Sequence, residues 1–101
     1  MPEQYLPELD PVLHSTLRLS VISVLAGVKE ADFNYLKERT RATNGNLSVQ
    51  LSKLKEAEYI DIHKSFENNY PKTTCKITRK GIKALEQYVQ DLKIILNQKI
   101  V

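Results

Sequence analysis

Apolar residues recur at helical spacing in four stretches of this chain, and each stretch predicts a helix. The first helix is expected from Pro11 to about Ala26, because an aspartate followed by a proline is typical of an N-cap and a first turn. One stripe of its apolar side chains comprises Leu13, Leu17, Val21 and Val24. A second group on the other side comprises Val12, Leu19 and Ile22. A helix that is apolar on two sides is covered either by its own domain or by a partner subunit.

The next two helices are separated by a polar turn. Gly27 ends the first helix and Asp32 caps the second, which turns Phe33 and Leu36 inward. Residues 41–46 are predicted to form the turn, and Thr43 or Asn44 then caps a third helix. The inward stripe of this third helix comprises Leu47, Leu51 and Leu54.

Two alternating segments follow, and they predict a pair of strands. The first contains Tyr59, Ile60 and Ile62, and the second contains Thr73, Cys75 and Ile77. Residues 67–71 between them have the composition of a loose hairpin tip. The chain then returns to helical spacing after Thr78, which is expected to cap a helix that runs to about Gln98.

The last helix has the spacing of a coiled-coil seam. Its apolar residues alternate at intervals of three and four: Ile82, Leu85, Val89, Leu92 and Leu96. A helix of about five turns is longer than so small a domain can cover by itself. The pattern favours pairing between two subunits, and the alternative is a lid on the helix's own domain. The predicted dimer interface comprises Val12, Leu19, Ile22, Ile82, Leu85, Val89, Leu92 and Leu96.

The order of these elements predicts a mainly α fold with a small two-stranded β-wing, that is, a winged helix-turn-helix with a long C-terminal dimerisation helix. The chain has 101 residues, which is the size of one domain. Its expected parts are an N-terminal arm at 1–10, a winged-helix core at 11–81 and the C-terminal helix at 82–101.

Charge is unevenly distributed along the chain. Residues 1–10 carry three acidic side chains and no cation, whereas residues 59–80 carry five cations against two acids, although the net charge of the whole chain is only +3. Positive charge therefore gathers on the predicted ribbon, where contact with phosphate would need it.

Composition excludes several other classes of protein. Cys75 is the only cysteine, so an internal disulfide and a cysteine-based zinc cluster are excluded, and a lone thiol in a strand is most often a small buried apolar group. The three glycines are too dispersed for a phosphate-binding loop, and His14 and His63 lie on different elements. We expect no enzyme activity, no metal and no cofactor. The first residues have neither a basic start nor an apolar run, which favours a cytoplasmic location without a membrane partner.

The outward face of the third helix is suited to reading base pairs. Asparagine and glutamine present a donor beside an acceptor, lysine donates to guanine, and valine can pack on a thymine methyl group. The predicted base-reading residues are Asn44, Asn46, Ser48, Val49, Gln50 and Lys53. The predicted phosphate and wing contacts are Arg41, Thr43, Lys64, Asn69, Tyr70, Lys72, Thr73 and Lys76. The alternative is a plain solvated helix face, which is usually richer in glutamate and lysine.

Residues 10–90 resemble the small winged-helix regulators related to the MarR and ArsR groups. The resemblance lies in Asp32-Phe33 with Leu36-Lys37, in residues 43–48 with Leu51, in residues 54–60, and in Pro71-Lys72-Thr73 leading into residues 77–81. It implies a homodimeric transcriptional regulator that binds an inverted repeat in double-stranded DNA, and we expect it to act as a repressor. Two departures concern Glu58, where such proteins usually have glycine, and the hairpin tip, where Asn68, Asn69 and Tyr70 replace arginines.

Two alternatives remain beside DNA recognition. A winged helix can serve as a protein-interaction module, but of the outward residues on the third helix only Val49 is apolar. A small-molecule effector of unidentified chemistry could also bind between the winged-helix core and the dimer helices, near Tyr5, Leu9 and Tyr88, but core packing is the favoured explanation for these residues.

Overall fold

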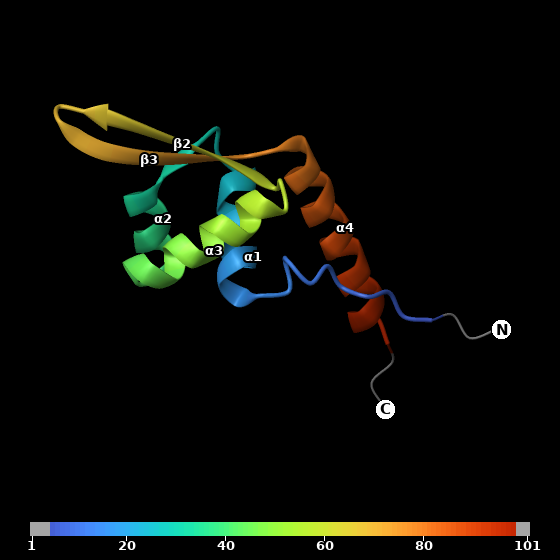
Figure 1. Cartoon of the computed structure of the whole chain (residues 1–101). Helices are drawn as coiled ribbons and strands as arrows, with labels where there is room; N and C mark the ends of the chain where they lie inside the picture. Colours follow the sequence, from blue (N-terminus) through green and yellow to red (C-terminus); the bar gives the residue numbers. More distant parts are fainter. Residues whose placement is uncertain (1–4, 99–101) are drawn as a thin grey trace.

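The computed structural model describes residues 5–98, so the first four residues of the expected arm and the last three of the expected C-terminal helix lie outside it. Within the described part, the elements follow in the order α1 (Thr16–Ala26), β1 (Ala31–Asp32), α2 (Phe33–Thr40), α3 (Asn44–Glu56), β2 (Ile60–Glu67), β3 (Tyr70–Ile77) and α4 (Arg79–Leu96). This order is the predicted mainly α winged helix-turn-helix. The β2–β3 wing and α4 extend toward opposite ends of the molecule, which measures 63 × 25 × 21 Å (Figure 1).

The first helix begins five residues later than the sequence predicts. Asp10 does cap a turn, because its carboxylate accepts a hydrogen bond from the Val12 amide at 2.8 Å. That turn does not continue, since Ser15 adopts an extended conformation with φ of −152° and its hydroxyl accepts from the Arg18 amide at 3.4 Å. The prediction of a helix from Pro11 is therefore wrong: the turn capped by Asp10 ends before Ser15, and Ser15 caps a separate helix that begins at Thr16.

The sheet contains one strand more than the sequence predicts. β1 pairs antiparallel with β3, joining Ala31 to Cys75 and Asp32 to Thr74, so the strand order among the described residues is β1-β3-β2. A strand of two residues is too short to show an alternating pattern, so hydrophobic periodicity does not predict it. This pairing attaches the base of the wing to the start of α2.

The wing ends in a tight turn instead of the expected loose tip. Asn68 and Asn69 both have positive φ, at 52° and 65°, and the strands pair up to Glu67 and Tyr70. Two consecutive left-handed residues form the hairpin turn that matches the twist of its strands, and asparagine tolerates this conformation better than most residues. Tyr70 and Pro71 therefore belong to β3.

The core lies between the three N-terminal helices, the base of the wing and α4. Leu36, the predicted α3 stripe and Cys75 are all buried, which confirms these assignments. Burial raises the pKa of the Cys75 thiol to about 11, as expected for a cysteine that packs as an apolar group. None of the helices within residues 5–98 is long and apolar enough to span a bilayer.

Candidate nucleic-acid interface

The α2–α3 connection is a sharp turn of three residues, shorter than the predicted 41–46. Arg41 ends α2 in the left-handed conformation, with φ of 59°, and the side chain of Thr43 accepts from the Asn46 amide at 3.2 Å. Because Thr43 is the cap, α3 already begins at Asn44, and Asn44 and Asn46 stand in its first turn. Arg41 and Thr43 are both exposed beside this turn.

α3 has one buried and one exposed face. Leu47, Leu51 and Leu54 point into the core, whereas the side chain of Val49 on the opposite face is 51% exposed. Five of the six predicted base-reading residues are exposed: Asn44, Asn46, Ser48, Val49 and Lys53. The helix lies across the front of α1 in Figure 1, with its buried face toward the core. The exposed face of α3 is about 20 Å long, and a helix with such a face can enter the major groove of DNA.

Gln50, the sixth predicted base-reading residue, is half-buried and held by neighbours. Its side-chain oxygen accepts a hydrogen bond from Arg18 of α1, and its side-chain nitrogen donates to the Asn46 oxygen at 3.0 Å. The structure therefore places Gln50 behind Asn46 and not beside it on the outer face.

The wing carries its predicted contacts on two different faces. Lys64 and Thr73 form a cross-strand pair, and both line one shallow depression with Ser48 and Ser52 of α3. Side chains alternate along a strand, so neighbouring residues on each strand point to the outer face. Lys76 lies on that outer face, opposite Asp61 in the register, in a depression that also includes Glu30. The structure thus brings Lys64 and Thr73 next to α3, and it does not bring Lys76 there.

Between Lys64 and Thr73, the wing carries one cation, Lys72, and that cation is paired. The ammonium group of Lys72 lies 3.3 Å from the Glu67 carboxylate in an exposed ion pair. Asn69 lies in the turn and Tyr70 beside it, and the Tyr70 ring is 73% exposed, as is most of Phe66. The tip therefore presents aromatic rings and amides where the resembling regulators carry arginines.

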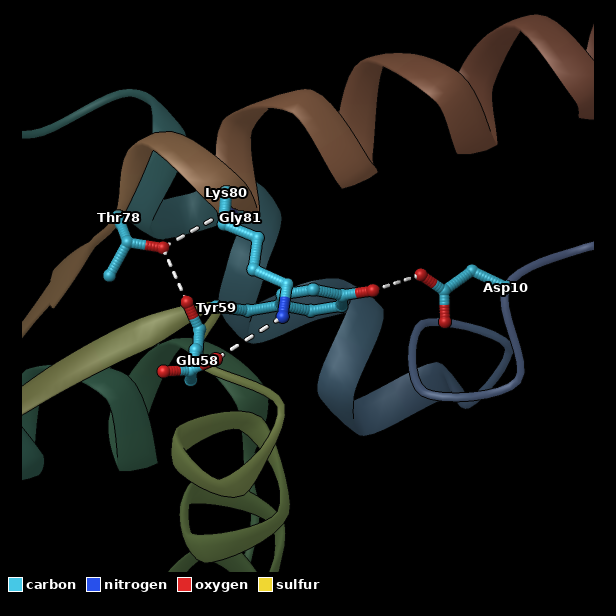
Figure 2. Close-up of polar contacts among 6 residues, drawn as sticks. All are labelled: Asp10, Glu58, Tyr59, Thr78, Lys80 and Gly81. Carbon is cyan, nitrogen blue, oxygen red and sulfur yellow. Dashed lines mark hydrogen bonds and ion pairs between the residues drawn. The ribbon is translucent and has the colours of Figure 1, made fainter.

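The C-terminal end of α3 is joined to the start of α4. Glu58 adopts the left-handed conformation, with φ of 65°, and the Tyr59 and Glu58 amides bond back to the Leu54 and Lys55 carbonyls at 3.0 and 2.9 Å. Glu58 thus fills the position where glycine is usual. Its carbonyl accepts from the Thr78 hydroxyl at 2.7 Å, and its carboxylate lies 3.4 Å from Lys80 (Figure 2).

Tyr59 extends this junction to the N-terminal arm. Its hydroxyl donates to the Asp10 carboxylate, and the Lys80 ammonium lies 5.9 Å from the centre of its ring (Figure 2). Burial, followed by the hydrogen bond and the negative charge of Asp10, raises the pKa of Tyr59 to about 12. The arm, α3, the wing and α4 consequently meet at one set of polar contacts, which holds α3 in a defined orientation to α4.

The predicted dimer residues divide into three groups. Ile22 is fully buried in its own chain, so it has no surface to offer a partner, and its assignment to the interface must be corrected. Val12, Leu19, Leu85 and Leu92 are half-buried against the chain's own core. Ile82, Val89 and Leu96 are exposed at 42%, 42% and 71%, at intervals of seven residues along one edge of α4. α4 packs against α1 by its other edge, around the buried Tyr88.

The three residues named for an effector cleft are separated by the structure. Tyr88 lies in the core, where its hydroxyl is 3.1 Å from Nδ1 of His14. Leu9 packs against the core and Tyr5 is fully exposed. Core packing accounts for Tyr88 and Leu9.

Arg18 is the main residue that sequence reasoning missed. A single arginine in an otherwise uncharged helix gives no local signal, since its partners lie in the preceding turn and in α3. Helical spacing predicts Asp10 only as a helix cap, but its carboxylate also accepts from the Tyr59 hydroxyl, 49 residues away in the sequence.

Comparison with known proteins defines the class to which this architecture belongs. The family model described as winged helix DNA-binding domain matches residues 17–96. An uncharacterized protein of Methanocaldococcus jannaschii is 36% identical over 81 residues, which cover 80% of this chain and 88% of that protein. The chain belongs to the winged helix DNA-binding domain family. Membership agrees with the expectation of a binding module without catalysis.

Solved structures show the same fold. A transcriptional regulator homologue from Pyrococcus horikoshii OT3 superposes with a TM-score of 0.79 at 22% identity, over 85% of each chain. A MarR family transcriptional regulator from Silicibacter pomeroyi gives a TM-score of 0.64 at 13% identity, over 89% of this chain and 62% of that chain. The predicted winged-helix fold is thereby confirmed.

Proposed function

We propose that this protein is a sequence-specific DNA-binding transcriptional regulator that acts as a homodimer on an inverted repeat, most simply as a repressor that occupies its site. The observation that carries the proposal is the exposed face of α3, with Asn46, Val49 and Lys53, beside Lys64 of the wing. Amide, methyl and ammonium groups on one helix face supply donors, acceptors and apolar contact for base edges, while the neighbouring lysine supplies a phosphate contact.

The homodimer is supported by the exposed line of Ile82, Val89 and Leu96 on α4. Apolar side chains at intervals of seven residues recur on the same face of a helix, and in water they are stabilised by pairing with a second apolar surface. A two-fold dimer presents two copies of α3, so its binding site consists of two inverted half-sites about 10 base pairs apart, or a multiple of that distance.

A protein-interaction module without DNA binding is the second candidate function. It is favoured by the exposed aromatic rings of Phe66 and Tyr70 at the wing tip, since aromatic side chains are enriched at protein interfaces. It does not account for the polar exposed face of α3. DNase footprinting on genomic fragments, with a titration of salt, separates the two: two protected half-sites and a steep loss of affinity with salt support the regulator.

Replacement of Asn46 by alanine is expected to reduce affinity for the cognate site by about 1–3 kcal/mol and to relax preference at one base position of each half-site. The reason is the loss of an amide at the exposed start of α3. Competition binding against a set of single-base variants measures both effects. Replacement of Asn34, an exposed asparagine of α2 outside this face, is the control. If the Asn46 variant binds with unchanged affinity and preference, α3 is not the reading helix.

Replacement of Lys64 by alanine is expected to weaken binding to every sequence and to lower the salt slope by about one unit. Lys64 stands beside α3, where a phosphate of the bound duplex would approach. Lys76→Ala is the matched control. It removes the same single positive charge from the wing, but from the face that points away from α3. Equal effects of the two substitutions on the salt slope would show that the wing acts only through its total charge.

A further inference from the structure

A chain of hydrogen bonds connects α1 to the reading face of α3. Arg18 of α1 is held by the turn before it, since Nε donates to the Val12 carbonyl at 2.6 Å and Nη2 to the Pro11 carbonyl at 3.5 Å. Its remaining nitrogen, Nη1, donates to Oε1 of Gln50. Nε2 of Gln50 donates in turn to Oδ1 of Asn46 at 3.0 Å. Asn46 is the exposed end of this chain.

The direction of every bond in this chain is fixed by the arginine. A guanidinium group has only donors, so the oxygen of the Gln50 carboxamide must face Arg18. The nitrogen of Gln50 must then face Asn46, and it too can only donate. Asn46 therefore turns its oxygen toward Gln50 and its NH2 group away from it. The two ends of an amide are usually told apart only by their partners, and here the partner permits one arrangement.

We propose that Arg18 is a positioning residue which acts through Gln50 to make Asn46 a hydrogen-bond donor toward DNA. This inference rests on the proposed function and specifies what the same site recognises. In the major groove guanine and thymine present a carbonyl acceptor, O6 or O4, whereas adenine and cytosine present an amino donor at the corresponding place. A hydrogen bond donated by Asn46 at this place therefore favours a keto base, guanine or thymine, over an amino base, whereas one donated to N7, an acceptor of both purines, would not distinguish guanine from adenine.

Replacement of Gln50 by glutamate reverses the direction of the hydrogen bond between residues 50 and 46 and leaves Arg18 in place. A carboxylate still accepts from the guanidinium, but it has no proton to donate to Asn46. Asn46 must then rotate its NH2 group toward the carboxylate and expose its oxygen. The preference at the contacted position should shift from keto to amino bases, by about three- to tenfold in relative affinity, which is the range for one net hydrogen bond.

The experiment begins by locating the contacted position, which is the one whose base preference disappears in the Asn46→Ala variant. Relative affinities for all four bases at that position are then measured for the wild type, Gln50→Glu and Arg18→Met. In Arg18→Met the Gln50 amide is free to reverse. This variant should therefore bind keto and amino bases with nearly equal affinity at that position. The negative charge added by Gln50→Glu lowers affinity for all sequences alike and cancels in the ratio.

Arg39→Met is the matched control for the lost arginine, because Arg39 donates to Tyr35 within α2 and takes no part in the chain. It should keep the wild-type preference. Far-UV circular dichroism and thermal unfolding identify any variant that fails to fold, and Gln50→Glu retains every bond that Arg18 makes to the backbone. An amino preference in the wild type, or an unchanged preference in a folded Gln50→Glu variant that still binds DNA, would overturn the proposal. A wild type without any footprint would instead remove the proposed function itself.

Discussion

Replacement of Gly81 by alanine is expected to lower the free energy of unfolding by about 1–3 kcal/mol, although alanine is the better helix former by about 1 kcal/mol. Gly81 lies in the first turn of α4, where an added Cβ would stand 2.2 Å from the Tyr59 carbonyl oxygen. That oxygen is held in place, because it accepts a hydrogen bond from the Thr78 amide at 3.0 Å. The backbone of α4 or β2 must move to admit the methyl group, and the junction of Figure 2 must open with it.

Gly45 provides the matched control for this prediction. It also lies in the first turn of a helix, but an added Cβ meets nothing within 4 Å. The same substitution should therefore stabilise the protein by a few tenths of a kcal/mol to about 1 kcal/mol. Urea unfolding followed by circular dichroism, at one protein concentration for both variants, measures the two changes. A Gly81→Ala protein as stable as the wild type would show that α3, β2 and α4 are not rigidly joined at this point.

Replacement of Val89 by glutamate is expected to dissociate the proposed homodimer, with a dissociation constant raised about a hundredfold or more. In a two-fold pairing through α4 each copy would place a carboxylate in the interface, and desolvating such a group costs several kcal/mol. Val89 is 42% exposed in the single chain, so the domain itself should fold normally. Analytical ultracentrifugation measures the association, and binding to a full inverted repeat should weaken much more than binding to one half-site.

Ile94 is the control for the dimer prediction. It is a second exposed apolar residue of α4, 52% accessible and turned well away from the line of Val89 by the helical spacing. Ile94→Glu should leave both association and DNA binding unchanged. If both glutamate variants remain dimeric, the two subunits pair through a surface other than the exposed edge of α4.

Most of the local structure could be read from the sequence because it depends on neighbouring residues. The caps at Asp32, Thr43 and Thr78 each satisfy an amide three residues ahead, and the stripe of Leu47, Leu51 and Leu54 follows from helical spacing. Two predicted boundaries differ from the structure by a few residues. The turn before α3 ends at Thr43 instead of residue 46, and the hairpin turn is limited to Asn68 and Asn69. In both places several polar residues could have served, and the packed structure selected among them.

Other features required contacts between distant parts of the chain. β1 is defined only by its pairing with β3. Ile22 and Leu85 belong to the same kind of apolar pattern as Val89. Only the packing of α1 and α4 decides that Ile22 is wholly inside, Leu85 half-buried and Val89 exposed.

The sequence by itself determined the order of elements, the apolar stripes and the composition of the exposed face of α3, because spacing and capping act within a few residues. The tertiary structure decided how these side chains are oriented and which of them share a face. It placed Lys64 and Lys76 on opposite faces of the wing. It also placed Gln50 behind Asn46, where Gln50 links Asn46 to Arg18. Hydrogen bonds across 32 residues of chain depend on the packing of whole helices, and helical or strand periodicity carries no record of them.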